Sequence, residues 1–391
     1  MQRLFRISFN QFIFSFTPIL VWFVIGIIVD PKLVNVFSVT YPMQFVYLIL
    51  LAMFGTGPNI NETKDHKKGA AFSGFLMGAM IGGIIFLLVI LNLDHYLSFM
   101  NVEYDSYKEF ALFSLISLYV SLIFGMLMEK LYFTQKEKQA NKFMVIFNLI
   151  YAVSLIGTSL LSNDKTLVVV VSLMCLTVFV FYTGIKTFSN FRFKLNVHFY
   201  KWFRYESYEI MADIMMFLIY LFGLSHSNSY GVEYMVAINF NALITDTQWD
   251  SFGEICTVAK IDISKNKFNY KNSLRNSYKL LAVLMFTSFL MLVVTLPFYQ
   301  IDMSIFLVYL VVELCYFVVY PFIALKSSYL QIEYSPFKTT FNGLIGFVLR
   351  FLANFINTPF CLCIGEMACA IYELIAYGIM FRKIPKKQIE K

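Results

Sequence analysis

Apolar stretches of about 20 residues recur along this sequence, separated by short polar segments. A helix needs about 20 residues to cross the hydrocarbon core of a bilayer, because each residue rises about 1.5 Å through a layer about 30 Å thick. Apolar residues make up 59% of the 391 residues and charged residues only 14%, against roughly 45–50% and about 25% in soluble domains. We therefore predict an all-α integral membrane protein rather than a soluble one.

Twelve segments have the length and apolar character of membrane spans. We place them near residues 9–29, 37–58, 70–92, 110–133, 143–161, 166–185, 205–223, 231–258, 277–299, 303–325, 338–358 and 360–381. The last two are so close together that they must form a tight hairpin, and Pro359 suits the turn between them.

Lys and Arg residues lie almost entirely in alternate loops. One set of loops, together with both termini, holds 26 of the 31, whereas the other set holds only Lys32, Lys108 and Lys165. Lys130 and Arg350 lie within spans. Since cytoplasmic loops carry the excess of Lys and Arg, we expect a multi-pass protein of the cell membrane with both termini in the cytoplasm. The net charge of +7 then reflects topology and does not indicate binding of nucleic acid.

A basic segment divides the twelve spans into two groups of six. We predict an N-terminal six-helix lobe at residues 1–187, a basic cytoplasmic linker at 188–204 and a C-terminal six-helix lobe at 205–391. Because six is an even number, the two lobes have the same orientation and should be related by a pseudo-two-fold axis along the membrane normal.

Weak similarity between the two halves supports a duplication. The second span runs into Phe54-Gly55 and the eighth into Phe252-Gly253, each ahead of a basic loop. The fifth and eleventh spans also open with similar residues, FNLI and FNGLI. Chance similarity between apolar segments is the alternative explanation.

Acidic residues inside the spans are concentrated in the last six. An ionised side chain at mid-bilayer costs about 2.5–3.5 kcal/mol, so each needs a partner, water or a function. Asp213, about nine residues into the seventh span, and Glu313, about ten residues from either end of the tenth, lie near the midplane. We interpret both as candidate ligands of a cation, proton or substrate, with a structural polar contact as the alternative. Glu209 lies nearer the cytoplasm on the seventh span and is a further candidate.

The eighth span carries acidic residues at a spacing of four. Asp246, Asp250 and Glu254 therefore lie on one helix face, with Asn239 further into the membrane. One interpretation is a cation path that includes Asn239, Asp246 and Asp250. The other is that the span loses its apolar character near Thr245 and continues as a partly solvated helix.

One arginine lies deep within a span. Arg350 is about eight residues from the outer end of the eleventh span, and Glu366 is about six residues from the outer end of the twelfth. Their depths match across the predicted hairpin, and an unpaired arginine at that depth would be costly. We therefore expect a structural ion pair between Arg350 and Glu366.

Several motifs of enzymes and metal sites are missing from the sequence. There is no Gly-x-x-x-x-Gly-Lys phosphate loop, no Cys-x-x-Cys pair and no histidine within a predicted span. We therefore expect no metal, no bound cofactor and no ATP-driven step. A membrane-embedded enzyme is not favoured, because it would need a substantial external loop or a buried base.

The arrangement of six plus six spans resembles the multidrug and toxic compound extrusion (MATE) family, within the larger group that includes polysaccharide-lipid flippases. The stretch AMFGTGPNINETKDHKKGAAFSGFL, residues 52–76, is similar to that family's connection between the second and third spans. Pro18 stands where many members have a first-span proline. The resemblance covers nearly the whole chain.

This resemblance implies a function and a site. MATE proteins export organic cations or other amphipathic compounds in exchange for Na⁺ or H⁺, by rocking two lobes around a central cavity. One branch uses acidic residues on the seventh and tenth spans, which match Asp213 or Glu209 and Glu313 here. The other branch uses a first-span aspartate, and this chain has no acid there.

The leading functional prediction is thus a monomeric exporter coupled to Na⁺ or H⁺ that works by alternating access. Its partners would be a small-molecule substrate and membrane lipid. The alternative is a flippase for a lipid-linked saccharide or a related lipid precursor. A flippase of that kind would need basic groups around its cavity, and the sequence offers only Arg350 at depth.

Overall fold

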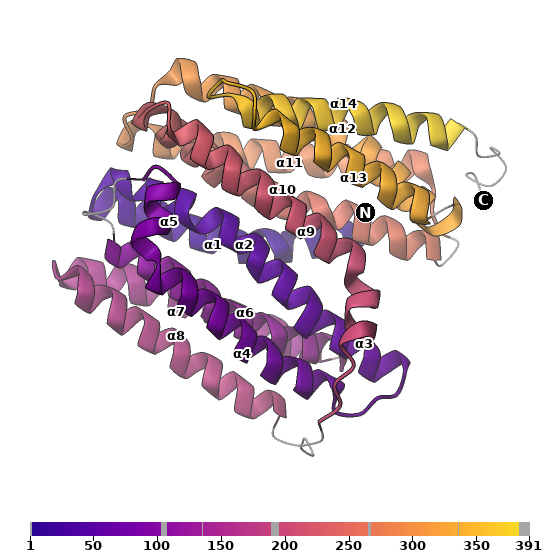
Figure 1. Cartoon of the computed structure of the whole chain (residues 1–391), viewed down its shortest axis with the longest axis horizontal. Coiled ribbons are helices and arrows are strands. Elements are labelled where there is room, and N and C mark those ends of the chain that lie inside the picture. The colour runs from indigo at the N-terminus through magenta and orange to yellow at the C-terminus, as the bar shows by residue number, and fades with distance from the viewer. Residues whose placement is uncertain are drawn as a thin grey trace. The chain divides into compact units, whose positions relative to one another are not determined.

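The computed structural model describes residues 2–102, 108–134, 136–188, 195–264, 267–334 and 336–382. Within these ranges all regular secondary structure is helical (Figure 1). Twelve long helices occupy the twelve predicted spans: α1 (Gln2–Ile28), α2 (Val36–Leu51), α4 (Ala70–Leu91), α6 (Lys108–Phe133), α7 (Glu137–Leu161), α8 (Lys165–Phe188), α9 (Phe199–Asn228), α10 (Val232–Ser264), α11 (Tyr270–Thr295), α12 (Met303–Tyr329), α13 (Pro336–Ala353) and α14 (Cys361–Arg382). The prediction of an all-α fold is confirmed.

Six shorter elements join these helices in the described ranges. Two are α-helical, α3 (Gly57–Lys64) and α5 (Leu93–Phe99), and two are 3-10 turns, η1 (Pro31–Asn35) and η3 (Leu296–Phe298). The remaining two are π-helical turns, η2 (Ala52–Thr56) and η4 (Leu330–Tyr334). None of the six was predicted as a separate element from the sequence.

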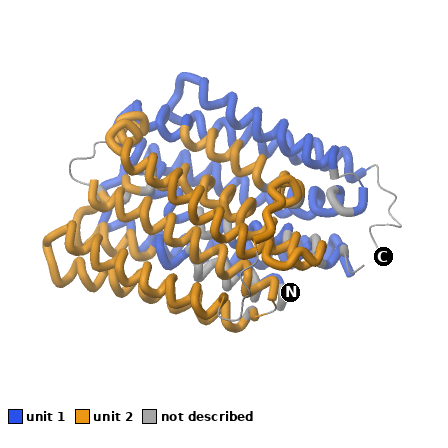
Figure 2. Tube along the Cα trace, turned by 60° about the horizontal axis from the view of Figure 1, so that its bottom comes forward, with its two compact units in different colours: residues 1–19, 222–391 blue, residues 20–221 orange. Residues whose placement is uncertain are grey.

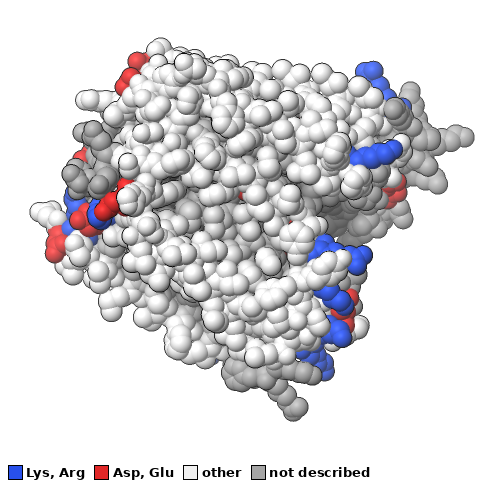
Figure 3. Space-filling model, viewed as in Figure 1, with Lys and Arg blue, Asp and Glu red and all other residues white. Residues whose placement is uncertain are grey.

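The helices have the character of membrane spans. In the described part of the chain, nine helices are long and apolar enough to cross a bilayer by length and composition. Helices α1 and α10 contribute shorter apolar stretches, Phe16–Ile28 and Val232–Thr245. On the face shown in Figure 3, charged side chains gather near the ends of the helices and are almost absent from their middles. The chain is a multi-pass membrane protein.

Two compact units make up the chain (Figure 2). Unit 1 contains residues 1–19 and 222–391, and unit 2 contains residues 20–221. Helices α1 and α9 each contribute residues to both units. The lobes predicted at residues 1–187 and 205–391, with a linker between them, stay a prediction.

Helix α6 is the centre of unit 2. It packs on α2, α4, α7 and α8, and its Phe124 ring stacks on Phe147 of α7 with centroids 4.3 Å apart. Glycines at every fourth position of α4 let that helix approach α6 closely, because a Cβ added at Gly78 would lie 2.6 Å from Met126 Sδ. This small-residue ridge is a packing feature.

The segment between α2 and α4 is not a loop. It continues as η2 and then α3, which has a proline within its first two positions. Glu62 on α3 binds Lys130 of α6 at 2.6 Å and accepts hydrogen bonds from the backbone N–H groups of Gly69 and Ala71 at 3.2 and 3.0 Å. We call this region the α3–α4 corner, residues 57–73.

The chain that leads into α9 is attached to this corner. The Asn196 backbone N–H donates to Ser73 Oγ at 2.7 Å, and Lys201 Nζ lies 3.3 Å from Asp65 Oδ2. A Cβ added at Gly57 would lie 2.8 Å from the Trp202 carbonyl oxygen. As a result α9 begins at Phe199, inside the linker that the sequence predicted to reach residue 204.

Helix α12 is the centre of unit 1. It packs on α10, α11 and α14, while α13 and α14 form the predicted hairpin. Phe252 of α10 stacks on Phe317 of α12 with ring centroids 5.2 Å apart. The Pro359 carbonyl in the hairpin turn accepts hydrogen bonds from Ser227 Oγ at 2.8 Å and Tyr309 OH at 2.9 Å. These bonds hold the turn against α9 and α12.

Helix α10 extends well beyond its apolar part. The sequence left open whether this region is a cation path or a partly solvated extension, and the helix does continue to Ser264. Phe252, Ile255, Ala259 and Ile263 are all buried in the core of unit 1. Their spacing of three or four residues places them on one helix face, so the extension packs against the protein along that face.

Candidate functional site

Arg350 and Glu366 form a buried ion pair in unit 1. Arg350 Nη2 of α13 lies 3.5 Å from Glu366 Oε1 of α14, and the two side chains are only 6% and 7% exposed. Gly365 permits this approach, because a Cβ there would lie 2.7 Å from the Arg350 carbonyl oxygen. The tight hairpin thus positions the pair.

Glu313 extends this pair into a cluster. Its Oε2 accepts a hydrogen bond of 2.8 Å from Trp249 Nε1 on α10. The carboxyl groups of Glu313 and Glu366 lie close enough to each other for a hydrogen bond. Two ionised carboxylates have only acceptor atoms, so a hydrogen bond between them requires that one carries a proton.

A third carboxyl lies beside the same arginine. Glu373, two turns beyond Glu366 on α14, is 8% exposed and interacts electrostatically with Arg350. Its Oε1 lies 3.3 Å from the position of a Cβ at Gly346 of α13. The Tyr316 hydroxyl of α12 is within electrostatic range of Glu373, Glu366 and Arg350. We call Glu313, Arg350, Glu366 and Glu373 the carboxyl–arginine cluster.

The cluster has an excess of acidic groups in an apolar environment. It holds three carboxyls and one guanidinium, and three of the four side chains are almost fully buried. The Trp249 ring packs against Tyr316 and Phe317 at centroid distances of 4.8 and 4.7 Å, which screens Glu313 with aromatic rings. An ionised group buried without a partner is costly, so the excess carboxyls must bind protons or another cation.

In the part of the chain that the structure describes, no group of three or more His, Cys, Asp or Glu side chains is arranged to hold a metal ion.

The other predicted site residues are distributed over both units. Asp213 lies on α9 in unit 2 and is half-buried, and its membership of one site with Glu313 stays a prediction. Asn239 on α10 is completely buried in unit 1. Side chains that lie outside the described residues are those of Glu209, Asp246 and Asp250.

The pairing of Trp249 with Glu313 was not predicted from the sequence. The two residues are separated by 64 positions, and nothing in a single sequence shows which aromatic residue faces a given carboxyl. The tryptophan does stand within the acidic part of α10, next to Gln248. That position, in an otherwise polar stretch, was the available signal.

These observations define a class: a multi-pass α-helical membrane protein with buried, partly uncompensated charge inside one helical unit. Its fold is that of MATE transporters of the MOP superfamily, as the resemblance predicted. The chain is similar to a multidrug resistance MATE family transporter in its inward-facing conformation, with a TM-score of 0.68, 12% identity, and coverage of 95% of this chain and 94% of that one.

Two further solved structures show the same fold. A MOP superfamily transporter from Pyrococcus furiosus, whose binding pocket has reversed polarity, matches with a TM-score of 0.67, 15% identity, and coverage of 97% and 95%. A MATE protein in complex with MaD3S matches with a TM-score of 0.66, 16% identity, and coverage of 97% and 94%. No protein-family model and no curated protein sequence matches the chain. The structural neighbours are transporters and not enzymes.

Proposed function

We propose that this protein is a proton-coupled secondary exporter of small cationic or amphipathic compounds. The single observation that carries the proposal is the close approach of the Glu313 and Glu366 carboxyls, beside a third acid and one arginine. A fold shared with MATE transporters supports it. In this proposal the protein acts as a single chain in the cell membrane, with both termini in the cytoplasm, by alternating access.

Coupling follows from competition for the same carboxyls. When Glu313 and Glu366 share a proton, the pair carries one negative charge, which Arg350 offsets. When that proton leaves, the extra negative charge favours binding of a cation, because a low dielectric strengthens the attraction. Protons and a cationic substrate then exclude each other, which is the requirement for antiport. Na⁺ is the alternative coupling ion.

The flippase alternative is not favoured. It requires basic groups that are available to an anionic head group, and Arg350 is the one basic residue predicted at depth in the second group of spans. The structure pairs that arginine with Glu366. A lipid phosphate would have to compete with this carboxylate.

Efflux from proteoliposomes tests the proposal. The purified full-length chain is reconstituted, loaded with a cationic dye, and energised separately with a pH gradient and with a Na⁺ gradient. We expect efflux driven by the pH gradient, and loss of that dependence in Glu313→Gln and Glu366→Gln. Glu233→Gln is the matched control, because Glu233 is an exposed carboxylate of α10 in the same unit.

Two results would contradict this function. Unchanged, still gradient-dependent efflux in both cluster variants would remove the assigned site. Efflux driven by the Na⁺ gradient alone would replace the proton by Na⁺ as the coupling ion.

A further inference from the structure

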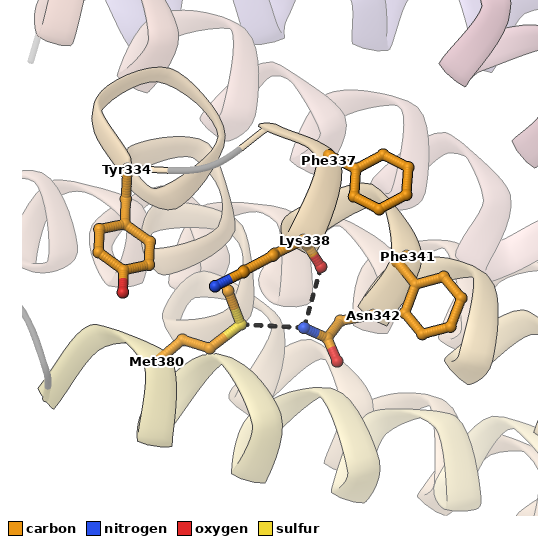
Figure 4. A pocket seen from close by; sticks show the side chains of 6 residues that line it. All are labelled: Tyr334, Phe337, Lys338, Phe341, Asn342 and Met380. Carbon is orange, nitrogen blue, oxygen red and sulfur yellow. Dashed lines mark hydrogen bonds between the residues drawn. The ribbon is translucent and has the colours of Figure 1, made fainter.

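A cavity lies in unit 1, outside the carboxyl–arginine cluster. It has a volume of about 210 Å³ and is formed by η4, the start of α13 and the end of α14 (Figure 4). Its lining residues are Tyr334, Phe337, Lys338, Phe341, Asn342 and Met380. These elements belong to a set of loops and helix ends that the Lys and Arg distribution assigns to the cytoplasmic side.

Aromatic rings extend from the rim of this cavity along the outside of α13. The Phe337 and Phe341 rings are stacked with centroids 6.5 Å apart and planes within 15°. Phe337 is 80% exposed and Phe341 56% exposed. The exposed apolar face continues along the helix to Val348 and to Leu352 near its other end. An exposed apolar helix face of this kind can lie against acyl chains at the membrane boundary.

Lys338 places a positive charge in the cavity. In Figure 4 its side chain extends between Tyr334 and Met380, away from the two phenylalanine rings. The opposite wall is held in place, because Asn342 Nδ2 donates to the Lys338 carbonyl at 3.0 Å and contacts Met380 Sδ at 2.9 Å. Asn342 Oδ1 accepts a bond of 3.0 Å from Tyr372 OH. The cavity is thus a fixed, mostly apolar pocket with one cationic group and the Tyr334 hydroxyl.

Further basic residues surround this end of unit 1. The charges of Lys326 on α12 and Arg382 at the end of α14 act on each other, and Lys326 Nζ lies 3.9 Å from the Cβ position of Gly378. One exposed carboxylate, Glu333, lies on η4. The described charged groups here are three cations and one anion, so the local potential favours a negatively charged ligand.

We propose that this cavity binds the phosphate head group of an anionic phospholipid from the cytoplasmic leaflet. Lys338 Nζ pairs with the phosphate, the Tyr334 hydroxyl donates to it, and an acyl chain lies along Phe337 and Phe341. Basic residues at the cytoplasmic surface attract anionic lipids by about 1 kcal/mol each. The proposal does not depend on transport, and the lysine disfavours a cationic substrate as the occupant.

Lipid-dependent thermal unfolding of the purified full-length protein in detergent tests this site. We expect phosphatidylglycerol to raise the unfolding midpoint more than phosphatidylcholine. In Lys338→Gln the apparent Kd for phosphatidylglycerol should be about fivefold weaker, the equivalent of about 1 kcal/mol. Lys338→Arg should keep the preference, because it keeps the charge. The matched control is Lys67→Gln, which removes an exposed lysine from the α3–α4 corner.

The proposal fails if the two lipids stabilise the wild type equally. It also fails if Lys338→Gln and Lys67→Gln respond to phosphatidylglycerol alike. A third measurement uses inorganic phosphate in place of lipid. If millimolar phosphate alone gives the full stabilisation and removes the effect of the lipid, the site is a phosphate site and the lipid assignment is wrong.

Discussion

Replacing Gly365 by alanine tests whether close approach of α13 and α14 builds the carboxyl–arginine cluster. The added Cβ would lie 2.7 Å from the Arg350 carbonyl oxygen and 3.1 Å from Ala353 Cβ. The first contact is with backbone, which cannot rotate away, so the two helices must separate by several tenths of an ångström. Arg350 and Glu366 are already 3.5 Å apart, beyond the usual 2.7–2.9 Å of a charge-assisted bond. The same displacement would therefore weaken their pairing.

The size of the effect follows from two opposing contributions. Overpacking in a well-packed interior costs about 1–3 kcal/mol, whereas glycine to alanine within a helix gains about 1 kcal/mol. We expect Gly365→Ala to lower the free energy of unfolding by up to about 2 kcal/mol. Gly253→Ala in α10 of the same unit is the control, because its Cβ would meet no atom within 4 Å. It should be neutral or stabilising by about 1 kcal/mol.

Unfolding of the purified protein in mixed micelles, followed by tryptophan fluorescence, measures both variants. The decisive quantity is the difference between them, which we expect to be about 1–3 kcal/mol. If Gly365→Ala is as stable as Gly253→Ala, the contact with the Arg350 carbonyl does not control the packing of the hairpin. The account of how the cluster is positioned would then be wrong.

Three further predictions use unfolding measurements. Lys130→Met should cost about 3 kcal/mol because it leaves the mostly buried Glu62 carboxylate without its ion-pair partner. Lys108→Met removes an exposed pair at the other end of α6 and should cost under about 1 kcal/mol. Equal losses of stability would contradict the role of burial. Trp249→Phe removes the donor to the carboxyl on α12 and should cost about 1.5–3 kcal/mol, so an unchanged stability would count against that bond. Hydrogen bonds from the first turn of α12 lower the pKa of Asp302 below 3.8. The stabilising contribution of the Asp302 carboxylate is therefore present above pH 3.8 and is lost as the pH falls through the lower folded-state pKa. The loss of stability caused by Asp302→Ala should thus become smaller on acidification. A loss that grows on acidification would contradict this sign.

Hydropathy predicted all twelve long helices, although α1 and α11 begin seven residues before their predicted spans. A bilayer leaves no water for backbone groups, so a long apolar run must form a helix, and its length is set by the thickness of the core. Helix α4, at Ala70–Leu91, differs from its predicted span by one residue at its C-terminal end. Helix α14, at Cys361–Arg382, differs from its predicted span by one residue at each end. The elements that were missed, such as α3 and η2, are short and polar or irregular, and hydropathy does not distinguish them from loops.

Side-chain partners were predictable only where the predicted fold left few possible partners. Arg350 and Glu366 were matched by depth, because a tight hairpin leaves little choice of partner. Glu313 on α12 has neighbours on α10 and α14, which are far apart from each other in the sequence. Which side chain of α10 faces Glu313 depends on the rotation and tilt of the helices, and Trp249 is the one that does. Those quantities come from packing between helices, which a single sequence does not reveal.

The attachment of residues 195–202 to the α3–α4 corner bears on the order in which the protein is assembled. Ribosomes deliver Asp65 and Ser73 long before Lys201 and Asn196, which bind them. The surface that receives the start of α9 is therefore synthesised, together with the Glu62–Lys130 pair, before α9 emerges. If this corner folds as it is synthesised, it provides a template that fixes where α9 begins, and hydropathy alone need not do so.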